Sequence, residues 1–197
     1  MGSYLQYLFV NFYCMDIPDI IWLMLGATAG FFLLFSRLPK KRWISWSLRL
    51  ILFCWIALVL YATIGDRTGG DTAQINLIPF HSYREVMQGG NPEIYRSNFM
   101  NAVLFYPAGL LAVVLLPETW PGWCRCALVV LLFAAVSAGI EYAQYLWQLG
   151  RVEMDDVLHN TAGALAGGLA ALWFPPVLVW TARKSKRMWE QYDHYRK

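Results

Sequence analysis

The sequence predicts an all-α membrane protein, a polytopic helix bundle of about five transmembrane helices in a single domain, residues 1–197. Hydrophobic residues make up 58% of the chain and charged residues only 15%, whereas soluble domains carry about 45–50% and about 25%. Ten tryptophans add to the apolar surface. Too few polar side chains remain to cover a water-soluble domain, which excludes the soluble, disordered and coiled-coil classes.

The third observation is a set of long stretches with few or no charges. A helix needs about 20 such residues to cross the hydrocarbon core of a bilayer. Five stretches qualify: 20–36, 43–64 with Arg49 inside it, 97–117, 125–151 and 157–182. Residues 1–15 are apolar but lack Lys or Arg, which predicts a short interfacial helix rather than a signal peptide.

The distribution of charge predicts the orientation. Placing the first basic loop inside, as the positive-inside rule asks, gives the inner side 12 Lys and Arg against three acids. The outer side then holds four Arg against ten acids. We therefore expect the N-terminus outside and the C-terminus in the cytoplasm. The basic tail, residues 183–197, would rest on anionic lipid rather than bind nucleic acid.

The outer segment between the second and third spans is predicted to be ordered. It contains an apolar stretch, residues 76–80 (NLIPF). A short helix should follow, with Ser82 as N-cap, Glu85 in capping-box spacing and Gly89 as the stop. Asn91, Pro92 and Glu93 then predict the start of the third long helix.

Polar residues within the spans are costly and indicate function. Asn98 and Asn101 share a face near the outer end of the third span, where interhelical hydrogen bonding would also explain them. Glu141 should stand in the outer third of the fourth helix, with Gln144 on the same face. The structural alternative for Glu141 is a buried ion pair that fixes the packing.

The connection between the fourth and fifth spans is predicted to be a tight hairpin, with Gly150 ending the fourth helix. Asp155 or Asp156 could cap the fifth helix, and their i,i+4 partners are His159 and Asn160. An oxygen-rich cation site is one interpretation, but a hydrogen-bonding or proton-transfer cluster is favoured and no metal ligand is assigned. A Gly163-x-x-x-Gly167 pair predicts close helix packing, with self-association as the alternative.

All these groups fall at the outer face, which predicts a polar cavity opening to the outer leaflet. The guanidinium of arginine is suited to binding phosphate, and a carboxylate is suited to general acid–base catalysis. The candidate catalytic residues are Glu141, Asp156, Gln144 and Asn160. The candidate substrate-binding residues are Arg151, Arg84, Asn101, Asn76, Asp155 and His159.

At these positions the sequence resembles the VanZ-like membrane proteins. The matching pieces are NLIPF at 76–80, Asn101 with Leu104-Phe105 and Pro107-x-Gly109, Glu141-x-x-Gln144, and Gly150-Arg151 followed by Asp156, Asn160, Gly163 and Gly167. They cover residues 73–172. The resemblance implies a bacterial plasma-membrane protein linked to resistance against glycopeptide antibiotics, teicoplanin in particular. It implies no reaction, and it gives no role to His159.

Three functions fit the sequence. The first is a cavity that binds, and as a further option chemically alters, a phosphate-bearing lipid or a lipid-linked cell-wall precursor. Here the arginines would hold phosphate and Glu141 would move a proton. Asp156 and Asn160 would orient Glu141, Arg151 or a bound water. The second is a non-catalytic protein that shields an envelope lipid or excludes a lipidated antibiotic. In the third, the charged residues only stabilise the packing of the helix bundle, and the function resides in a partner. The oligomeric state stays open.

Overall fold

The computed structural model describes residues 15–37, 42–65 and 74–174. The chain divides into two compact units, one of residues 1–40 and 170–197 and the other of residues 41–169. The expected interfacial helix before Met15 and the expected basic tail lie outside the described residues. All the candidate site residues belong to the second unit.

Five helices in the described part of the chain are long and apolar enough to cross a membrane. They are Ile17–Leu34, Trp43–Gly65, Glu93–Leu115, Gly122–Leu146 and Met154–Phe174. The predicted five-span, all-α membrane bundle is therefore confirmed. In the first unit, α2 (Ile17–Arg37) carries Asp19 in its first turn, where an acid opposes the helix dipole.

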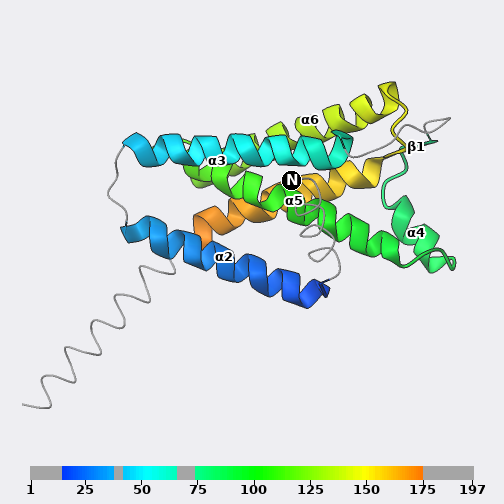
Figure 1. Cartoon of the computed structure of the whole chain (residues 1–197), viewed down its shortest axis with the longest axis horizontal. Helices are drawn as coiled ribbons and strands as arrows, with labels where there is room; N and C mark the ends of the chain where they lie inside the picture. The colour runs from blue at the N-terminus through cyan, green and yellow to red at the C-terminus, as the bar shows by residue number, and fades with distance from the viewer. Residues whose placement is uncertain (1–14, 38–41, 66–73, 175–197) are drawn as a thin grey trace, which may run out of the picture. The chain divides into compact units, whose positions relative to one another are not determined.

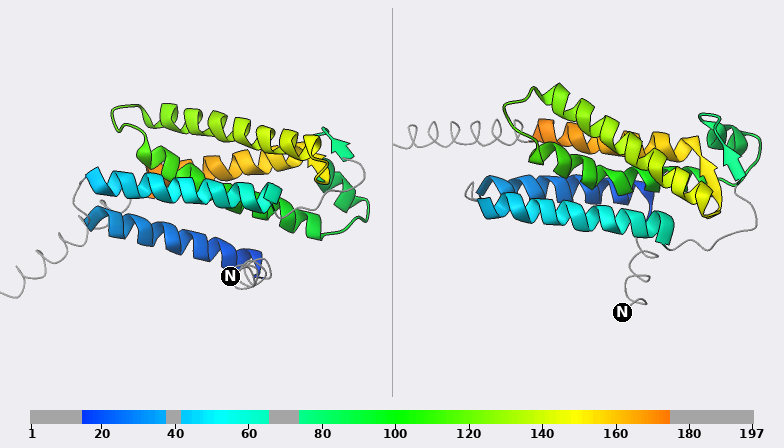
Figure 2. Two further views of the ribbon diagram at one scale, coloured as in Figure 1. Left: turned by 45° about the horizontal axis from the view of Figure 1, so that its top comes forward. Right: turned by 90° about the horizontal axis from the view of Figure 1, so that it is seen from above.

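The second unit is built around four of these helices, which run side by side in both views of Figure 2. They are α3 (Arg42–Leu60), which continues into the π-helical turn η1 (Tyr61–Gly65), α5 (Glu93–Leu115), α6 (Gly122–Leu146) and the helix Met154–Phe174. The helix α5 has the largest buried fraction of the five spans. Its Phe105 packs edge-on against Phe133 of α6, with ring centroids 6.0 Å apart.

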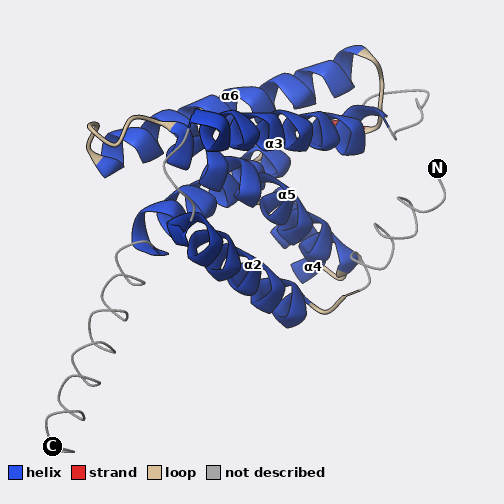
Figure 3. Ribbon diagram, turned by 60° about the vertical axis from the view of Figure 1, so that its left-hand side comes forward, coloured by secondary structure: helices blue, strands red, loops and turns tan. Residues whose placement is uncertain are grey.

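The short elements gather at one end of this unit, which we call the site end (Figure 1). They are β1 (Gln74–Asn76), α4 (His81–Met87) and β2 (Arg151–Glu153). Among the described residues almost everything in Figure 3 is blue helix, and very little is red strand. The two strands pair in parallel, with Gln74 opposite Arg151, Ile75 opposite Val152 and Asn76 opposite Glu153. The sequence predicted an ordered outer segment and a tight hairpin at these positions, without strands.

Glycines let α5 and the Met154–Phe174 helix meet backbone to backbone. A Cβ added to Gly163 would collide with the carbonyl of Ala102, one added to Gly167 with that of Tyr106, and one added to Gly109 with that of Ala164. Small residues allow such close approach in membranes. The predicted packing role of the Gly163-x-x-x-Gly167 pair inside the bundle is confirmed.

The helix α5 continues through Pro107, which has no N–H to donate to the preceding turn. Close to this weakened point, the indole Nε1–H of Trp55 on α3 donates to the carbonyl of Leu104 at 2.9 Å. The carbonyl that the proline leaves without its helical donor is that of Val103, so the Trp55 bond does not replace the missing one but ties α3 to α5 one residue further along.

Glycine was predicted to end both α4 and α6, and the structure confirms this prediction for α4 but not for α6. Gly89 (φ 92) ends α4 as predicted, because the N–H of Gly90 donates to the carbonyl of Glu85 at 2.9 Å. The prediction that Gly150 ends α6 was wrong. The N–H of Leu149 donates to the carbonyl of Gln144 at 2.9 Å, which closes the helix with Gln148 (φ 52) in the left-handed position.

Candidate functional site

A pocket of about 260 Å³ opens at the site end. Its walls come from α4, the start of α5, β2 and the first turn of the last helix. The pairing of β1 with β2 and the packing of α4 against α5 bring these segments together. The lining residues are Glu85, Ile94, Ser97, Asn98, Arg151, Glu153 and Asp156. Three of them are acids and one is a base, so the pocket is acidic around a central arginine.

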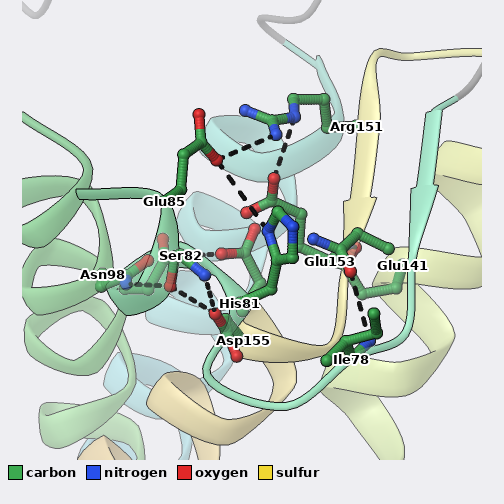
Figure 4. Close-up of polar contacts among 12 residues, drawn as sticks. Ile78, His81, Ser82, Glu85, Asn98, Glu141, Arg151, Glu153 and Asp155 are labelled. Atoms are coloured by element: carbon green, nitrogen blue, oxygen red, sulfur yellow. Dashed lines mark hydrogen bonds and ion pairs between the residues drawn. The ribbon is translucent and has the colours of Figure 1, made fainter. Parts of the chain in front are cut away.

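Arg151 lies between two carboxylates (Figure 4). Its Nε is 3.0 Å from Oε1 of Glu153, and its Nη2 is 3.5 Å from Oε2 of Glu85. The arginine side chain is 48% exposed, so solvent screens both ion pairs and each contributes little to stability. The guanidinium can therefore exchange one carboxylate for another anion at low cost.

Glu141 does not line the pocket but fixes one of its walls. The carboxylate is buried on α6, and its Oε2 accepts the backbone N–H of Glu153 at 2.9 Å. This bond ties β2 to α6, and Glu153 in turn contacts Arg151. Glu141 thus acts on the pocket through Glu153.

Asp155 is a buried carboxylate that anchors α4 from another part of the chain. It accepts the N–H of Phe80 at 2.5 Å and the N–H of Ser82 at 2.8 Å, and it also accepts the hydroxyl of Ser82. Asn98 on α5 donates to the Ser82 hydroxyl oxygen at 2.8 Å. Several donors stabilise an ionised carboxylate in a buried place.

This arrangement corrects the prediction that Ser82 caps α4. The helix begins at His81, its N-cap position is Phe80 (φ 60), and no side chain of the segment caps it. Asp155 satisfies the orphan N–H groups instead. Ser82 lies inside the first turn, and its hydroxyl points to Asp155.

His159 joins the last helix to α4 through Tyr83. Its Nδ1 is 2.5 Å from the carbonyl of Asp155, and its Nε2 is 2.6 Å from the hydroxyl of Tyr83. Because a carbonyl only accepts, Nδ1 is the donor to Asp155, and in the neutral tautomer that this requires Nε2 accepts from Tyr83. Burial, with smaller effects from Asp155 and Tyr95, raises the pKa of Tyr83 above its ordinary value of 10.0. The phenol therefore remains protonated and keeps this bond.

A buried polar row on α6 lies deeper in the bundle. Ser137, Glu141 and Gln144 share one helix face and are all buried. Nδ2 of Asn160 donates to the hydroxyl of Ser137 at 2.8 Å, and Nε2 of Gln144 donates to the carbonyl of Thr63 in η1 at 2.8 Å. The amide oxygens of Gln144 and Asn160 have no hydrogen-bond partner within the described residues.

The structure brings together only part of the predicted site. Arg151 and Asp156 line the pocket, and Nδ2 of Asn101 donates to Oδ1 of Asp156 at 2.7 Å. Asn76 lies opposite Glu153 in the strand pair, and its Oδ1 accepts the N–H of Ile78. Arg84 is exposed on α4 and does not line the pocket.

The remaining predicted residues lie around the pocket rather than in it. Asp155 and His159 hold α4 in place, Glu141 holds β2, and Gln144 and Asn160 lie inside the bundle. Among the described residues, no group of three or more His, Cys, Asp or Glu is placed to hold a metal ion.

Sequence reasoning missed Glu85 and Glu153 as pocket residues. Glu85 was explained by its capping-box spacing and Glu153 by its place in a polar hairpin. The only available signal for Glu153 was its position two residues after Arg151, which is the spacing of side chains on one face of a strand.

The fold and site define a multi-pass membrane protein with a charged pocket at one end of its helix bundle. The family model described as VanZ/LLP1 matches residues 48–175, which contain the strands, α4 and every pocket residue. The chain belongs to the VanZ/LLP1 family, which links it at family level to glycopeptide resistance. No curated protein and no solved structure matched the chain.

Proposed function

We propose that this protein binds a phosphate-bearing lipid, or a lipid-linked cell-wall precursor, by its head group in the pocket around Arg151. The observation that carries the proposal is a half-exposed guanidinium that lies between Glu85 and Glu153 and lines a pocket of about 260 Å³. Arginine binds phosphate oxygens through several parallel N–H bonds. The longer contact, 3.5 Å to Glu85, is the one a phosphate would replace.

The charge balance of the sequence supports an outward-facing pocket. With the first basic loop in the cytoplasm, the segments of the site end fall on the acidic side, which holds four Arg against ten acids. In a bacterial plasma membrane this side faces the outer leaflet, where cell-wall precursors are used. A glycopeptide antibiotic such as teicoplanin also acts there.

The acidic residues of the pocket restrict which lipid head groups it can bind. Glu85, Glu153 and Asp156 outnumber the single arginine, so a bare phosphate would meet net repulsion. A head group that carries amine or hydroxyl donors beside its phosphate would satisfy both kinds of side chain. Amino-alcohol and sugar-phosphate head groups have this chemistry.

A second candidate function is a non-catalytic one, in which the protein shields an envelope lipid or excludes a lipidated antibiotic. The contacts of the two buried carboxylates favour it. Glu141 accepts a backbone N–H of β2, and Asp155 accepts three donors from residues 80–82. Both act as positioning residues, so of the two predicted catalytic carboxylates, Glu141 and Asp156, only Asp156 lines the pocket.

The two arginines provide a matched test. Wild-type protein, Arg151→Ala and Arg84→Ala would be purified in nanodiscs made from bacterial lipid extract, and bound lipid would be identified by native mass spectrometry. We expect Arg151→Ala to bind phosphate-bearing lipid at least about tenfold more weakly, as removal of a charge-assisted hydrogen bond implies. Arg84→Ala should bind like the wild type.

Two controls make this comparison decisive. The melting temperature of each variant shows whether the bundle is intact, and teicoplanin susceptibility of cells expressing each variant tests the link to resistance. Unchanged lipid binding in a folded Arg151→Ala protein would contradict the proposal.

A further inference from the structure

The segment between β1 and α4 exposes an unusual amount of apolar surface. Ile75, Leu77, Ile78 and Phe80 are 54%, 64%, 51% and 58% exposed. Residues 74–80 contain no charged side chain. We call residues 75–80 the apolar segment. It lies at the site end, between the strand pair and α4 (Figure 1).

The apolar segment is held in this exposed conformation. Phe80 has a left-handed backbone (φ 60), which is costly for a bulky residue, and the buried Asp155 accepts its N–H. Asn76 Oδ1 accepts the N–H of Ile78, and the N–H of His81 donates to the carbonyl of Ile78 at 3.2 Å. The bundle thus fixes a turn that presents apolar side chains outward.

The position of the apolar segment in the chain indicates that membrane lipid covers it. It joins two candidate membrane spans, Trp43–Gly65 and Glu93–Leu115, at the end where both meet the site. Through the strand pair it is continuous with the end of α6, whose Tyr142, Tyr145 and Trp147 are exposed. Exposed Tyr and Trp at the end of a span mark the level of the lipid head groups.

We infer that the apolar segment is seated in the bilayer, at the boundary between head groups and acyl chains. A surface-lying apolar element at this boundary is buried by about 5–10 Å. Asn76 of the segment lies opposite Glu153, a pocket residue, in the strand pair. A segment inserted at this depth would therefore hold the pocket around Arg151 at the level of the lipid head groups. The inference does not depend on the pocket binding a lipid.

Photolabelling of the wild-type chain tests the inference. The protein would be reconstituted with a phospholipid that carries a photoactivatable group near the head group, illuminated, and digested with trypsin. The peptide of residues 68–84, between Arg67 and Arg84, contains the whole apolar segment. We expect lipid adducts at Leu77, Ile78 or Phe80. Adducts on the exposed Tyr142 or Tyr145 of α6, at the same end of the unit, but none on this peptide would overturn the inference.

A fluorescent probe measures the depth of insertion. In a chain whose native cysteines are replaced by alanine, an environment-sensitive dye would be attached at Leu77→Cys, with Leu131→Cys as the lipid-facing reference and Gln88→Cys as the water-facing one. We expect blue-shifted emission at position 77, quenched more strongly by a nitroxide near the lipid head group than by one near the chain end. Emission like that at position 88 would refute the inference.

The same fluorescence measurement distinguishes an apolar segment covered by lipid from one covered by a second protein chain. A blue-shifted but unquenched probe at position 77 would mean that a second copy of the chain covers the segment, and the inference would be wrong. The photolabelling needs no substitution, so it also decides the question if a cysteine variant fails to fold.

Discussion

At the scale of single residues, the buried carboxylates each bind backbone groups from distant parts of the chain. Asp155 binds the N–H groups of Phe80 and Ser82, and Glu141 binds that of Glu153. A buried charge is tolerated only when donors surround it. These two residues therefore decide where α4 and β2 lie, and through them the shape of the pocket.

Substitution of Glu141 separates positioning from acid/base catalysis. In Glu141→Gln the amide oxygen can still accept the N–H of Glu153, so we expect lipid binding, resistance and melting temperature close to those of the wild type. Glu141→Ala leaves that N–H without a partner and should lower the free energy of unfolding by about 1–3 kcal/mol.

Thermal unfolding in detergent, together with lipid binding, measures both Glu141 variants. A folded Glu141→Gln protein that no longer binds lipid or supports resistance would contradict the positioning role. Glu141 would then again be a candidate catalytic acid or base.

Tyr83 gives the fold a defined response to alkaline pH. Its folded-state pKa is raised, chiefly by burial, so the unfolded chain releases the phenol proton first as the pH increases. The stability from this group is complete below its unfolded pKa of about 10 and is lost as the pH rises through the folded pKa. We expect Tyr83→Phe to flatten the loss of stability above about pH 10.

Melting temperatures of wild-type and Tyr83→Phe protein between neutral and alkaline pH measure this effect. Tyr142→Phe, at an exposed tyrosine of α6, is the matched control and should leave the slope unchanged. Identical slopes in the wild type and Tyr83→Phe would refute the assignment.

At the scale of elements, the contact between α5 and the Met154–Phe174 helix depends on glycines. Gly163 and Gly167 face the carbonyls of Ala102 and Tyr106 with no room for a Cβ. Because both obstacles are backbone, neither can move aside as a flexible side chain would. The two helices must separate if either glycine gains a side chain.

Alanine at Gly167 should destabilise the bundle, whereas alanine at Gly139 should not. A Cβ at Gly139 would meet nothing within 4 Å, and alanine favours helix over glycine. Overpacking at Gly167 should cost about 1–3 kcal/mol. Melting temperatures of the two variants in the same detergent measure the difference, and equal values would contradict the tight helix contact.

At the scale of the whole molecule, the patterns that depend on composition and local spacing were predictable. The five spans follow from uncharged runs, and the helix contact follows from the Gly163-x-x-x-Gly167 spacing. Asn91 was predicted to cap α5; its Oδ1 accepts the N–H of Glu93 at 3.0 Å, although the helix begins at Glu93 with Pro92, not Asn91, in the N-cap position. Each of these features is decided within a few residues or a single helix.

The features that the sequence did not predict depend on segments far apart in the chain. The cap of α4 comes from Asp155, 75 positions after Phe80, so a capping rule that looks three residues ahead chose Ser82 instead. Each strand places one apolar residue between two polar ones, a pattern too short to distinguish a strand from a loop, and the pair forms where β2 packs against α6. The helix α4 begins at His81, two residues earlier than a Ser82 cap would require, and its Arg84 lies outside the pocket.

The polar contacts between α6 and the Met154–Phe174 helix have a consequence for biogenesis. Ser137 and Glu141 find their partners in Asn160 and in the N–H of Glu153, across the hairpin that joins the two helices. Either helix alone would enter lipid without these contacts, and a buried polar group that lacks a hydrogen bond costs up to several kcal/mol. We therefore expect the translocon to release the two helices together, as one preassembled hairpin.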